Sequence, residues 1–440
     1  MLQNAGIRQL TDMQQAAVAR ALDGDSFVLL SPTGSGKTLA YLLPLAFACD
    51  AGRSAVQAVV ILPSRELAQQ CEGVFRSLKS GLRSLCLHGG RPTMEEHRKL
   101  LEAAPQVVFA TPGRLDDHLE KGNIDSRGIS RLVIDEFDKC LELGFRDVMQ
   151  SIAARLSRVR QLILTSATDV PEIPAFVAAL PGPAAGSFGR LDFLSPSASV
   201  SSRIGLAVVP SPRKDKLETL AHLLSEIGGK PAIVFVAHRE SAERVGHYLR
   251  QARFAAEVYH GGMEQEHRER ALYKFRSGGS NVLVATDLAA RGLDIPEVHA
   301  VVHYHLSANE EAFIHRCGRT ARWTATGRAY LLLSPGESVP DYLPSDVPAC
   351  DVERCPVRPM EPDWRTLYIG RGKKDKLSRG DVVGFLCKKG GLRSGQLGRV
   401  DVFAHHAYAA VRRECLSGLL RAVAGEKIKG MKTLVEEMKR

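Results

Sequence analysis

Near its N-terminus the chain reads FVLLSPTGSGKT from Phe27 to Thr38, and this stretch decides the fold of the first half. Four apolar residues predict a buried strand, and the glycine-rich run after them leads into a helical pattern. In that setting the backbone N–H groups of the loop surround phosphate oxygens and a lysine reaches the β- and γ-phosphates. The residues that we expect to hold a nucleotide with Mg²⁺ are Thr33, Gly34, Ser35, Gly36, Lys37 and Thr38, with the Thr38 hydroxyl on the metal.

A second apolar run, Leu132 to Ile134, ends in Asp135 and Glu136. A carboxylate at a strand end beside a phosphate loop is suited to hold Mg²⁺ through water, and we predict this role for Asp135. Glu136 is placed to orient or deprotonate the attacking water. The alternative is that both carboxylates only favour the N-terminus of the next helix. The phosphate loop makes the catalytic interpretation the stronger one.

Two further motifs carry polar groups. Ser166 and Thr168 follow an apolar run, and their hydroxyls would couple the acidic motif to moving parts, although a Ser-Ala-Thr turn alone is ordinary. In HRCGRTAR, residues 315–322, arginines recur every three residues, beginning with Arg316 and Arg319. Such arginines either form a solvated basic helix or act on the charge that develops at a γ-phosphate, an effect worth ~10³–10⁵ in rate. Opposite a nucleotide cleft we favour the second interpretation.

The two halves of the chain repeat each other. AVVILPSRELA at residues 58–68 is matched by AIVFVAHRESA at 232–242, HGG at 88 by HGG at 260, and VVFAT at 107 by VLVAT at 282. Continuous apolar runs that alternate with helical patterns predict parallel strands buried on both faces. We therefore predict an α/β fold with two tandem parallel-sheet domains, residues 1–195 and 204–345, joined by a serine-rich hinge at 194–203.

Composition restricts the function classes. The 440 residues include no apolar run near the ~18 that a membrane span needs, so we expect no membrane partner. Nine cysteines are scattered without a Cys-x-x-Cys pair, which favours a reducing cytoplasm over a disulfide or zinc scaffold. The formal net charge is +10, and residues 365–440 supply the whole excess, with 18 Lys/Arg against 7 Asp/Glu. A basic segment on a near-neutral body is typical of nucleic-acid binding, with a merely solvated lysine-rich face as the alternative.

The basic segment forms a third part of the chain. Residues 346–363 are rich in proline and are predicted to be a linker. Residues 364–440 are predicted to form a small RRM-like domain of β-α-β-β-α-β order. Its expected strands are 366–370, 398–403, 407–412 and 431–435, and its expected helices are 378–388 and 414–424.

Side chains of this small domain indicate how it would hold RNA. Arg371, Lys373, Lys374 and Lys376 form a cationic turn suited to phosphates. The strands offer few aromatic side chains for base stacking, namely Tyr368 and Tyr408, and a core position for Tyr408 is an equal alternative. We therefore expect a folded RNA to be bound through charge and shape.

In this order the motifs resemble those of the DEAD-box RNA helicases of superfamily two. Residues 6–14 resemble the Q motif, and DEFD at residues 135–138 resembles the Asp-Glu-Ala-Asp motif. The resemblance implies two RecA-like domains, ATP and Mg²⁺ as cofactors, adenine contact by Gln14 and ribose contact by Asp294. It also implies that Arg316 and Arg319 are the arginine fingers. The residues that it places on the RNA backbone are Arg65, Gly90, Thr111, Arg114 and Thr286.

The chain departs from the family pattern without losing a catalytic residue. Leu10 replaces the Q-motif proline, Phe137 is bulkier than alanine, His305 stands where aspartate is usual, and Ala321 replaces a glycine. We expect an active ATPase, and Phe137 is the departure at which overpacking bears on the coupling between ATP and RNA.

Residues 365–440 resemble the RNA-binding domain of DbpA-type bacterial DEAD-box proteins, through LYIGRGKKDKL at residue 367, GDVVG at 380 and IKG at 428. That resemblance implies a 23S ribosomal RNA hairpin as target and a role in large-subunit assembly. We therefore expect a monomeric, cytoplasmic, ATP-dependent RNA helicase. The alternatives are an ATP-gated RNA clamp or annealer, and a DNA-directed translocase of the same superfamily.

Overall fold

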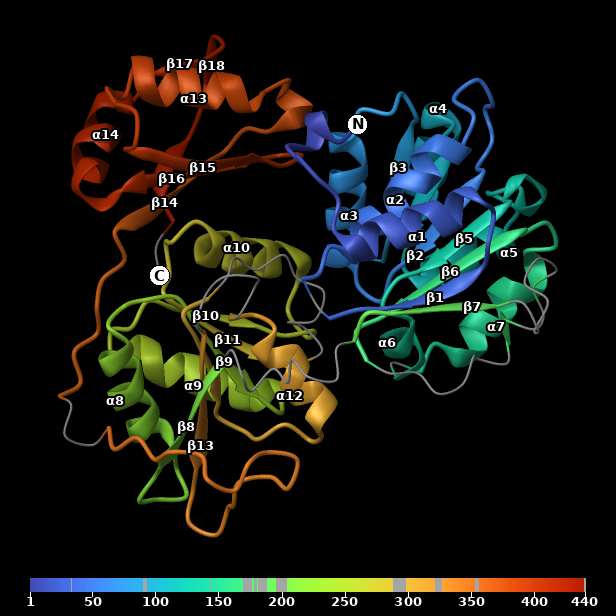
Figure 1. Cartoon of the computed structure of the whole chain (residues 1–440). Helices are drawn as coiled ribbons and strands as arrows, with labels where there is room; N and C mark the ends of the chain where they lie inside the picture. The colour runs from blue at the N-terminus through green and yellow to red at the C-terminus, as the bar shows by residue number, and fades with distance from the viewer. Residues whose placement is uncertain are drawn as a thin grey trace. The chain divides into compact units, whose positions relative to one another are not determined.

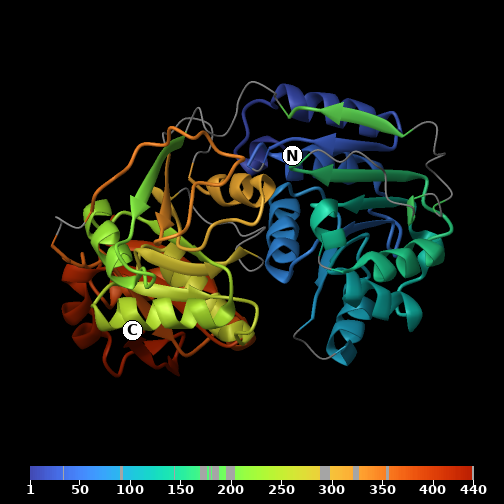
Figure 2. The same cartoon turned by 90° about the horizontal axis from the view of Figure 1, so that it is seen from below.

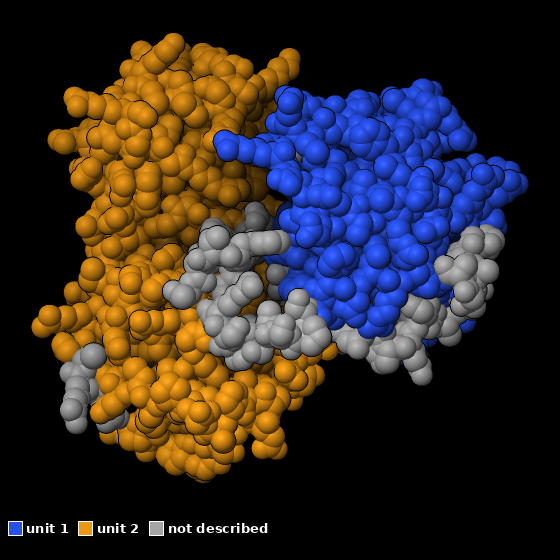
Figure 3. All heavy atoms as spheres, in the orientation of Figure 1, with its two compact units in different colours: residues 1–198, 292–294 blue, residues 199–291, 295–440 orange. Residues whose placement is uncertain are grey.

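A computed structural model describes most of the chain (Figure 1), namely residues 1–32, 34–89, 93–142, 144–168, 176–177, 180, 188–194, 204–287, 298–320, 327–352 and 356–438. It divides into two compact units, residues 1–198 with 292–294 and residues 199–291 with 295–440 (Figure 3). The predicted hinge at 194–203 lies outside the described residues except for Leu194. Within the described ranges, no helix combines the length and apolarity needed to cross a membrane.

Unit 1 is built on a parallel sheet, as the sequence predicts. The spatial order is β3-β4-β2-β5-β6-β1-β7. The strands are β1 (Phe27–Leu30), β2 (Ala58–Ile61), β3 (Ser84–Leu87), β4 (Val107–Ala110), β5 (Arg131–Ile134), β6 (Gln161–Ser166) and β7 (Gly189–Asp192). The helices are α1 (Asp12–Leu22), α2 (Lys37–Ala48), α3 (Arg65–Ser77), α4 (Thr93–Ala103), α5 (Pro112–Glu120), α6 (Phe137–Glu142) and α7 (Arg146–Arg155), with short 3₁₀ turns at Gln3–Ala5 and Ser126–Gly128.

Two hydrophobic cores explain why β1, β2 and β4 are apolar at every position. Val28 and Leu30 of β1 pack into the core on one face of the sheet, and Phe27 and Leu29 pack into the core on the other. Helices cover both faces (Figure 2), so a strand has no solvent side on which polar residues would alternate. Phe137, the departure in the acidic motif, is fully buried in the first of these cores.

Unit 2 begins with a second parallel sheet of order β10-β11-β9-β12-β13-β8. The strands are β8 (Ile204–Pro210), β9 (Ala232–Val236), β10 (Ala256–Tyr259), β11 (Val282–Thr286), β12 (Ala300–His303) and β13 (Gly327–Leu333), and the helices are α8 (Leu217–Ile227), α9 (Arg239–Gln251), α10 (Gln265–Arg276) and α12 (Glu310–Cys317). The run β10-β11-β9-β12-β13 repeats β3-β4-β2-β5-β6 of unit 1. The sequence repeat thus corresponds to a repeated topology, and the predicted tandem RecA-like sheets are confirmed.

The C-terminal domain, residues 364–440, belongs to the same unit and has an antiparallel sheet of order β15-β16-β14-β19. Its elements are β14 (Trp364–Ile369), α13 (Arg379–Lys388), β15 (Leu397–Val402), β16 (Ala407–Arg412), α14 (Leu416–Val423) and β19 (Val435–Glu437), with 3₁₀ turns at Lys373–Asp375 and Arg413–Cys415. This is the predicted β-α-β-β-α-β order. The expected strand at 431–435 is different: Met431–Lys432 (β18) pairs with Lys427–Ile428 (β17) in a separate hairpin, and the sheet is completed by β19.

The stretch predicted as a linker is packed on unit 2. The Val208 N–H donates to the Pro348 carbonyl at 2.9 Å, and the Cys350 N–H donates to the Val208 carbonyl at 2.7 Å. Val352 is buried in the unit 2 core. These contacts place part of the proline-rich stretch along β8, the edge strand of the sheet.

The sheet of the C-terminal domain is packed on one face and is partly covered on the other. Leu367, Ile369 and Val411 pack against α13 and α14, and α10 lies on the other side of the sheet (Figure 1). The ring of Tyr408 lies 5.0 Å from the ring of Tyr273 on α10, and the Tyr273 hydroxyl donates to the Arg399 carbonyl at 2.5 Å. The face that an RRM usually offers to single-stranded RNA is therefore covered in part by the second RecA-like domain.

Candidate ATP and RNA site

The predicted phosphate loop joins β1 to α2 as expected. Gly36 caps α2 with φ +90°, a left-handed conformation, and a Cβ there would meet the Gln14 amide at 2.4 Å. Glycine is thus required at this position for two reasons: the backbone has a positive φ, and there is no room for a Cβ atom beside Gln14. Lys37 is buried, and its ammonium donates to the carbonyl of Ser31 and to that of Pro32 at 2.9 Å. Burial lowers the pKa of Lys37, and the carboxylates of the acidic motif oppose this shift.

The carboxylate of Asp135 lies at the end of β5 and is 3% exposed. The Tyr41 hydroxyl donates to its Oδ2 at 2.8 Å. The Thr165 hydroxyl donates to its Oδ1, which also accepts from the Glu136 N–H at 3.1 Å. Burial raises the pKa of Tyr41 well above its usual range, so the phenol remains a donor. Sequence reasoning missed Tyr41, although a hydroxyl one turn after Lys37 in an apolar helix is a recognisable signal.

Glu136 and the Ser-Ala-Thr segment adjoin this carboxylate. Glu136 has φ +49°, which is uncommon for a residue with a side chain and is typical of functional sites. Its N–H also donates to the Thr165 hydroxyl at 3.2 Å. The Thr168 hydroxyl donates to Asp138 Oδ2 at 3.1 Å, and the Ser166 hydroxyl donates to the Thr168 carbonyl at 2.9 Å. The predicted link between Ser166, Thr168 and the acidic motif thus exists as a chain of hydrogen bonds.

Gln14, the residue expected to contact adenine, connects the N-terminal helix to the phosphate loop. Its amide donates to the Gly36 carbonyl at 3.1 Å, and its side-chain oxygen accepts from the Thr11 N–H at 3.0 Å in a capping box of α1. Adenine would compete for the same amide, so base recognition and loop position are linked through one side chain.

These residues fit ATP and Mg²⁺. The Ser35 hydroxyl is buried in the loop and has no hydrogen-bond partner among the described residues. A buried ammonium that is turned back onto loop carbonyls can exchange them for phosphate oxygens. Thr38 and Asp135 supply a hydroxyl and a carboxylate, the oxygen ligands that Mg²⁺ prefers. Thr33 lies outside the described residues.

One of the unit 1 residues expected on the RNA backbone, Arg114, is held by Glu96 of α4, which is 1% exposed. Its carboxylate accepts from the His88 N–H at 3.2 Å, lies 3.4 Å from Arg114 Nε and lies 3.3 Å from His118 Nε2. Arg114 also donates to the Thr93 hydroxyl at 2.6 Å.

Two neighbouring segments join the same network. The Gln69 amide lies 2.8 Å from His88 Nε2, and the Arg65 guanidinium lies beside Gly89, 3.0 Å from where a Cβ would be. Thr111 precedes α5, and its N–H donates to the Leu87 carbonyl at 3.1 Å. Arg65, Thr111 and Arg114, the residues expected on the RNA backbone, therefore lie around the ends of β3 and β4. Gly90 lies outside the described residues, and Glu96 was not foreseen because a lone glutamate in a helix carries no sequence signal.

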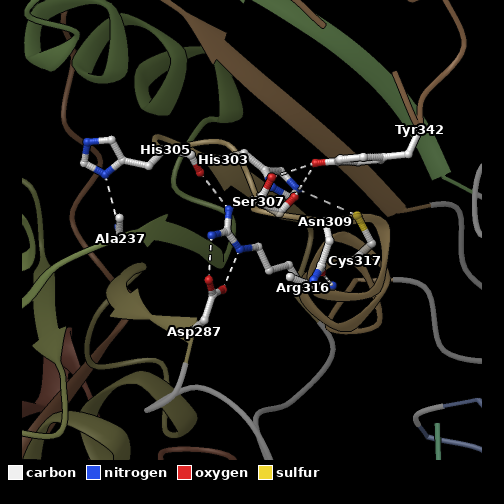
Figure 4. Close-up of polar contacts among 10 residues, drawn as sticks. Ala237, Asp287, His303, His305, Ser307, Asn309, Arg316, Cys317 and Tyr342 are labelled. Carbon is white, nitrogen blue, oxygen red and sulfur yellow. Dashed lines mark hydrogen bonds and ion pairs between the residues drawn. The ribbon is translucent and has the colours of Figure 1, made fainter. Parts of the chain in front are cut away.

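In unit 2, Arg316 is held in a buried network (Figure 4). Its guanidinium makes a two-point contact with Asp287, at 2.5 Å from Nε and 2.7 Å from a terminal nitrogen. The other terminal nitrogen bonds His303 Nδ1 at 3.1 Å and the His305 carbonyl at 2.7 Å. A finger role for Arg316 would require this network to open. Asp287 follows Thr286 at the end of β11, so Arg316 also positions a segment expected to contact RNA.

Arg319 and Asp294 are the other predicted ATP contacts in the second half of the chain. Arg319 is 6% exposed and follows the last turn of α12, where its carbonyl accepts from the Val298 N–H at 3.1 Å. Asp294 lies outside the described residues.

The cationic turn of the C-terminal domain follows β14 and rests on the loop before β16. The N–H groups of Lys373 and Lys374 donate to the carbonyls of Phe403 and Ala404 at 2.8 and 2.9 Å. A Cβ at Gly372 would meet those carbonyls at 2.5 and 2.6 Å, so this close approach requires glycine. The side chains of Lys373, Lys374 and Lys376 are exposed, whereas Arg371 pairs with Asp375 at 2.8 Å.

The two tyrosines predicted as stacking candidates occupy different environments. Tyr368 is half-buried and stacks on His406 with ring centres 5.7 Å apart. Tyr408 is 1% exposed beneath Tyr273 of α10. In this arrangement Tyr408 is a buried interface residue, which was the alternative interpretation of its sequence position.

Comparisons with known proteins agree with these motifs. Residues 11–173 match the DEAD/DEAH box helicase family, residues 215–324 the helicase conserved C-terminal domain and residues 366–437 the DbpA RNA binding domain. The chain is 34% identical to the ATP-dependent RNA helicase DbpA of Escherichia coli, over 100% of this chain and 96% of that protein. It is also 34% identical to the ATP-dependent rRNA helicase RRP3 of Kluyveromyces lactis, over 86% of this chain and 79% of that protein.

A solved structure gives the same result for the fold. Dbp5 of S. cerevisiae bound to RNA and ADP BeF3 aligns with a TM-score of 0.66 and 25% identity, over 76% of this chain and 86% of that chain. The match to DbpA spans the full chain and so includes both the helicase core and the RNA-binding domain. The chain therefore belongs to the DEAD-box ATP-dependent RNA helicases of the DbpA type.

Proposed function

We propose that this helicase remodels ribosomal RNA duplexes during assembly of the large ribosomal subunit, and that its C-terminal domain directs it to a 23S rRNA hairpin. The observation that carries this proposal is the exposed turn Lys373–Lys374–Lys376 on a domain whose sheet is partly covered by α10. Such a surface favours a folded RNA, bound through phosphates, over a row of unstacked bases. The rRNA helicase activity in the name of the RRP3 relative supports the same substrate class.

In the proposed reaction each residue acts on a defined group. Lys37 exchanges its loop carbonyls for phosphate oxygens, and Gln14 recognises the adenine edge. Thr38 and Asp135 hold Mg²⁺, which when bound neutralises charge on the phosphates. Glu136, with its backbone fixed by Asp135 and Thr165, orients the water that attacks the γ-phosphate. Arg319 stabilises the charge that develops there.

RNA contacts come from both units in this proposal. Arg65, Thr111 and Arg114 of unit 1 bind the backbone, with Arg114 held by Glu96, and Thr286 binds it from unit 2. Backbone contacts make the helicase core insensitive to RNA sequence. The C-terminal domain therefore selects the RNA, because binding it raises the local concentration of the target RNA near the helicase core. We further propose that the protein acts as a monomer in the cytoplasm, consistent with the absence of a disulfide among its described cysteines.

The test compares ATP hydrolysis by the full chain with two RNAs of equal length. One contains the peptidyl-transferase-region hairpin of large-subunit rRNA, and the other is unrelated. Lys373→Ala with Lys374→Ala should remove the preference for the hairpin RNA. Lys214→Ala with Lys230→Ala, at two exposed lysines elsewhere in unit 2, is the matched control. If the unmodified chain shows no preference, the proposed rRNA target is wrong and a general RNA-dependent ATPase remains.

A further inference from the structure

The buried carboxylate of Asp135 has a hydroxyl on each of its oxygens. Tyr41 donates to Oδ2 at 2.8 Å, and Thr165 donates to Oδ1. The three residues come from different elements, α2, β5 and β6. Asp135 is 3% exposed, Tyr41 1% and Thr165 fully buried, so water does not compete for these bonds. A buried carboxylate that is satisfied by two fixed hydroxyls has one preferred orientation.

Tyr41 joins this carboxylate to the helix that begins at the phosphate loop. It lies three residues after Thr38 and four after Lys37, the spacing that places side chains on one helix face. Thr165 joins it to the Ser-Ala-Thr segment, since Ser166 is the next residue of β6. The two hydroxyls thus connect both expected metal-binding elements to the segment expected to couple hydrolysis to motion.

We propose that Tyr41 and Thr165 are positioning residues that orient the Asp135 carboxylate for Mg²⁺ in the ATP site. This inference rests on the proposed role of Asp135 as a metal ligand. Groups that hydrogen-bond to a metal-ligating side chain and orient it typically cost 10–100-fold in metal affinity when they are removed. Loss of either hydroxyl frees the carboxylate to rotate, and Mg²⁺ then contributes less to nucleotide affinity.

Each of the two hydroxyls makes a second contact, and these contacts differ. The two substitutions are therefore expected to have different effects. The Thr165 hydroxyl also accepts from the Glu136 N–H at 3.2 Å and so supports the left-handed backbone of that residue. The Tyr41 hydroxyl contacts Cys71 Sγ at 3.4 Å. Tyr41→Phe should therefore affect the metal alone, whereas Thr165→Val should also lower kcat at saturating Mg²⁺ through Glu136.

The experiment measures the affinity of the full-length protein for fluorescent ADP with Mg²⁺ and with EDTA. The ratio of the two dissociation constants reports the metal contribution without hydrolysis. Tyr41→Phe and Thr165→Val should each reduce this ratio about tenfold, by the metal-affinity range above, while affinity in EDTA changes less than twofold. Thr165→Ser, which keeps the hydroxyl, should restore the ratio. Tyr330→Phe, at a buried tyrosine of β13 in unit 2, is the matched control.

Asp135→Asn separates this inference from the proposed site. If Asp135→Asn lowers the Mg²⁺ ratio and both Tyr41→Phe and Thr165→Val leave it unchanged, the positioning role is wrong and the metal site stands. If Asp135→Asn also leaves the ratio unchanged, the metal assignment itself is wrong. Equal loss of affinity with Mg²⁺ and with EDTA would mean that the hydroxyls only maintain the fold, which contradicts the proposal. Hydrogen exchange of β5 and β6 identifies a variant that has lost its structure, and the other of Tyr41→Phe and Thr165→Val then carries the test.

Discussion

Glu96→Ala should loosen the edge of unit 1 that is proposed to bind RNA. The substitution removes the acceptor of the His88 N–H and the partner of Arg114 and His118, all within 3.4 Å. It removes the Glu96 carboxylate from beside the Arg114 guanidinium, which is 13% exposed. Breaking a buried ion pair in this way costs about 3–5 kcal/mol. Glu96→Gln keeps one acceptor oxygen and should cost about 1–2 kcal/mol, close to one hydrogen bond.

Two measurements report this effect in the full-length protein. Hydrogen exchange of peptides that cover β3 and β4 gives the local opening free energy without assuming that the whole chain unfolds at once. The RNA concentration for half-maximal ATPase stimulation gives the functional consequence. It should rise at least tenfold for Glu96→Ala and less for Glu96→Gln, whereas affinity for nucleotide should not change.

Glu102→Ala is the matched control for the Glu96 variants. Glu102 lies on the same helix, its side chain is 67% exposed, and it pairs with Arg98 at 3.7 Å. A surface pair of this kind contributes about 0–1 kcal/mol. If Glu96→Ala and Glu102→Ala change exchange and RNA half-saturation equally, the network does not position the RNA contacts and the reasoning is refuted.

Three other predictions concern the ATP site, the C-terminal domain and the Arg316 network. Lys37→Ala or Glu136→Gln should abolish turnover in a phosphate-release assay and leave RNA binding by the C-terminal domain intact; full-rate hydrolysis would refute the site. Neutralising Lys373 and Lys374 should lower the slope of log affinity on log salt by about 0.7–0.9 per lost phosphate contact, and an unchanged slope would place the turn away from RNA. Burial, and secondarily Arg316, lower the pKa of His303 well below its usual range, so its contribution to stability is complete above about pH 6.5 and is lost on acidification at up to about 1.4 kcal/mol per pH unit. Thermal unfolding of unit 2 at pH 7.5 and 5.5 should show a smaller pH dependence in His303→Asn, and an equal dependence would contradict the neutral-histidine network.

Much of the fold could be predicted because local and global signals agree. In unit 1, β1, β2 and β4 are short apolar runs, and burial on both faces makes these runs continuous, so they were recognisable from composition alone. The repeat between the halves then indicated a shared topology. The hairpin β17–β18 was not predicted because two-residue strands have no periodicity to detect.

The site was predictable where chemistry depends on residues close in sequence, as in the phosphate loop. It was not predictable where function depends on contacts between distant residues. Tyr41 and Asp135 are 94 residues apart, and Arg316 and Asp287 are 29 apart. The docking of the C-terminal domain was also missed, because it joins Tyr273 to the Arg399 carbonyl and Tyr408, residues from two different domains.

The central claim is that ATP hydrolysis by this chain separates RNA strands near a hairpin held by its C-terminal domain. The most direct measurement is strand separation of an RNA duplex placed beside the rRNA hairpin, with the full chain, ATP and a trap strand. Separation should require ATP, should fail in Lys37→Ala and should be faster than with an unrelated hairpin of equal stability. Full ATP hydrolysis without strand separation would contradict the account and would identify an ATP-gated RNA clamp.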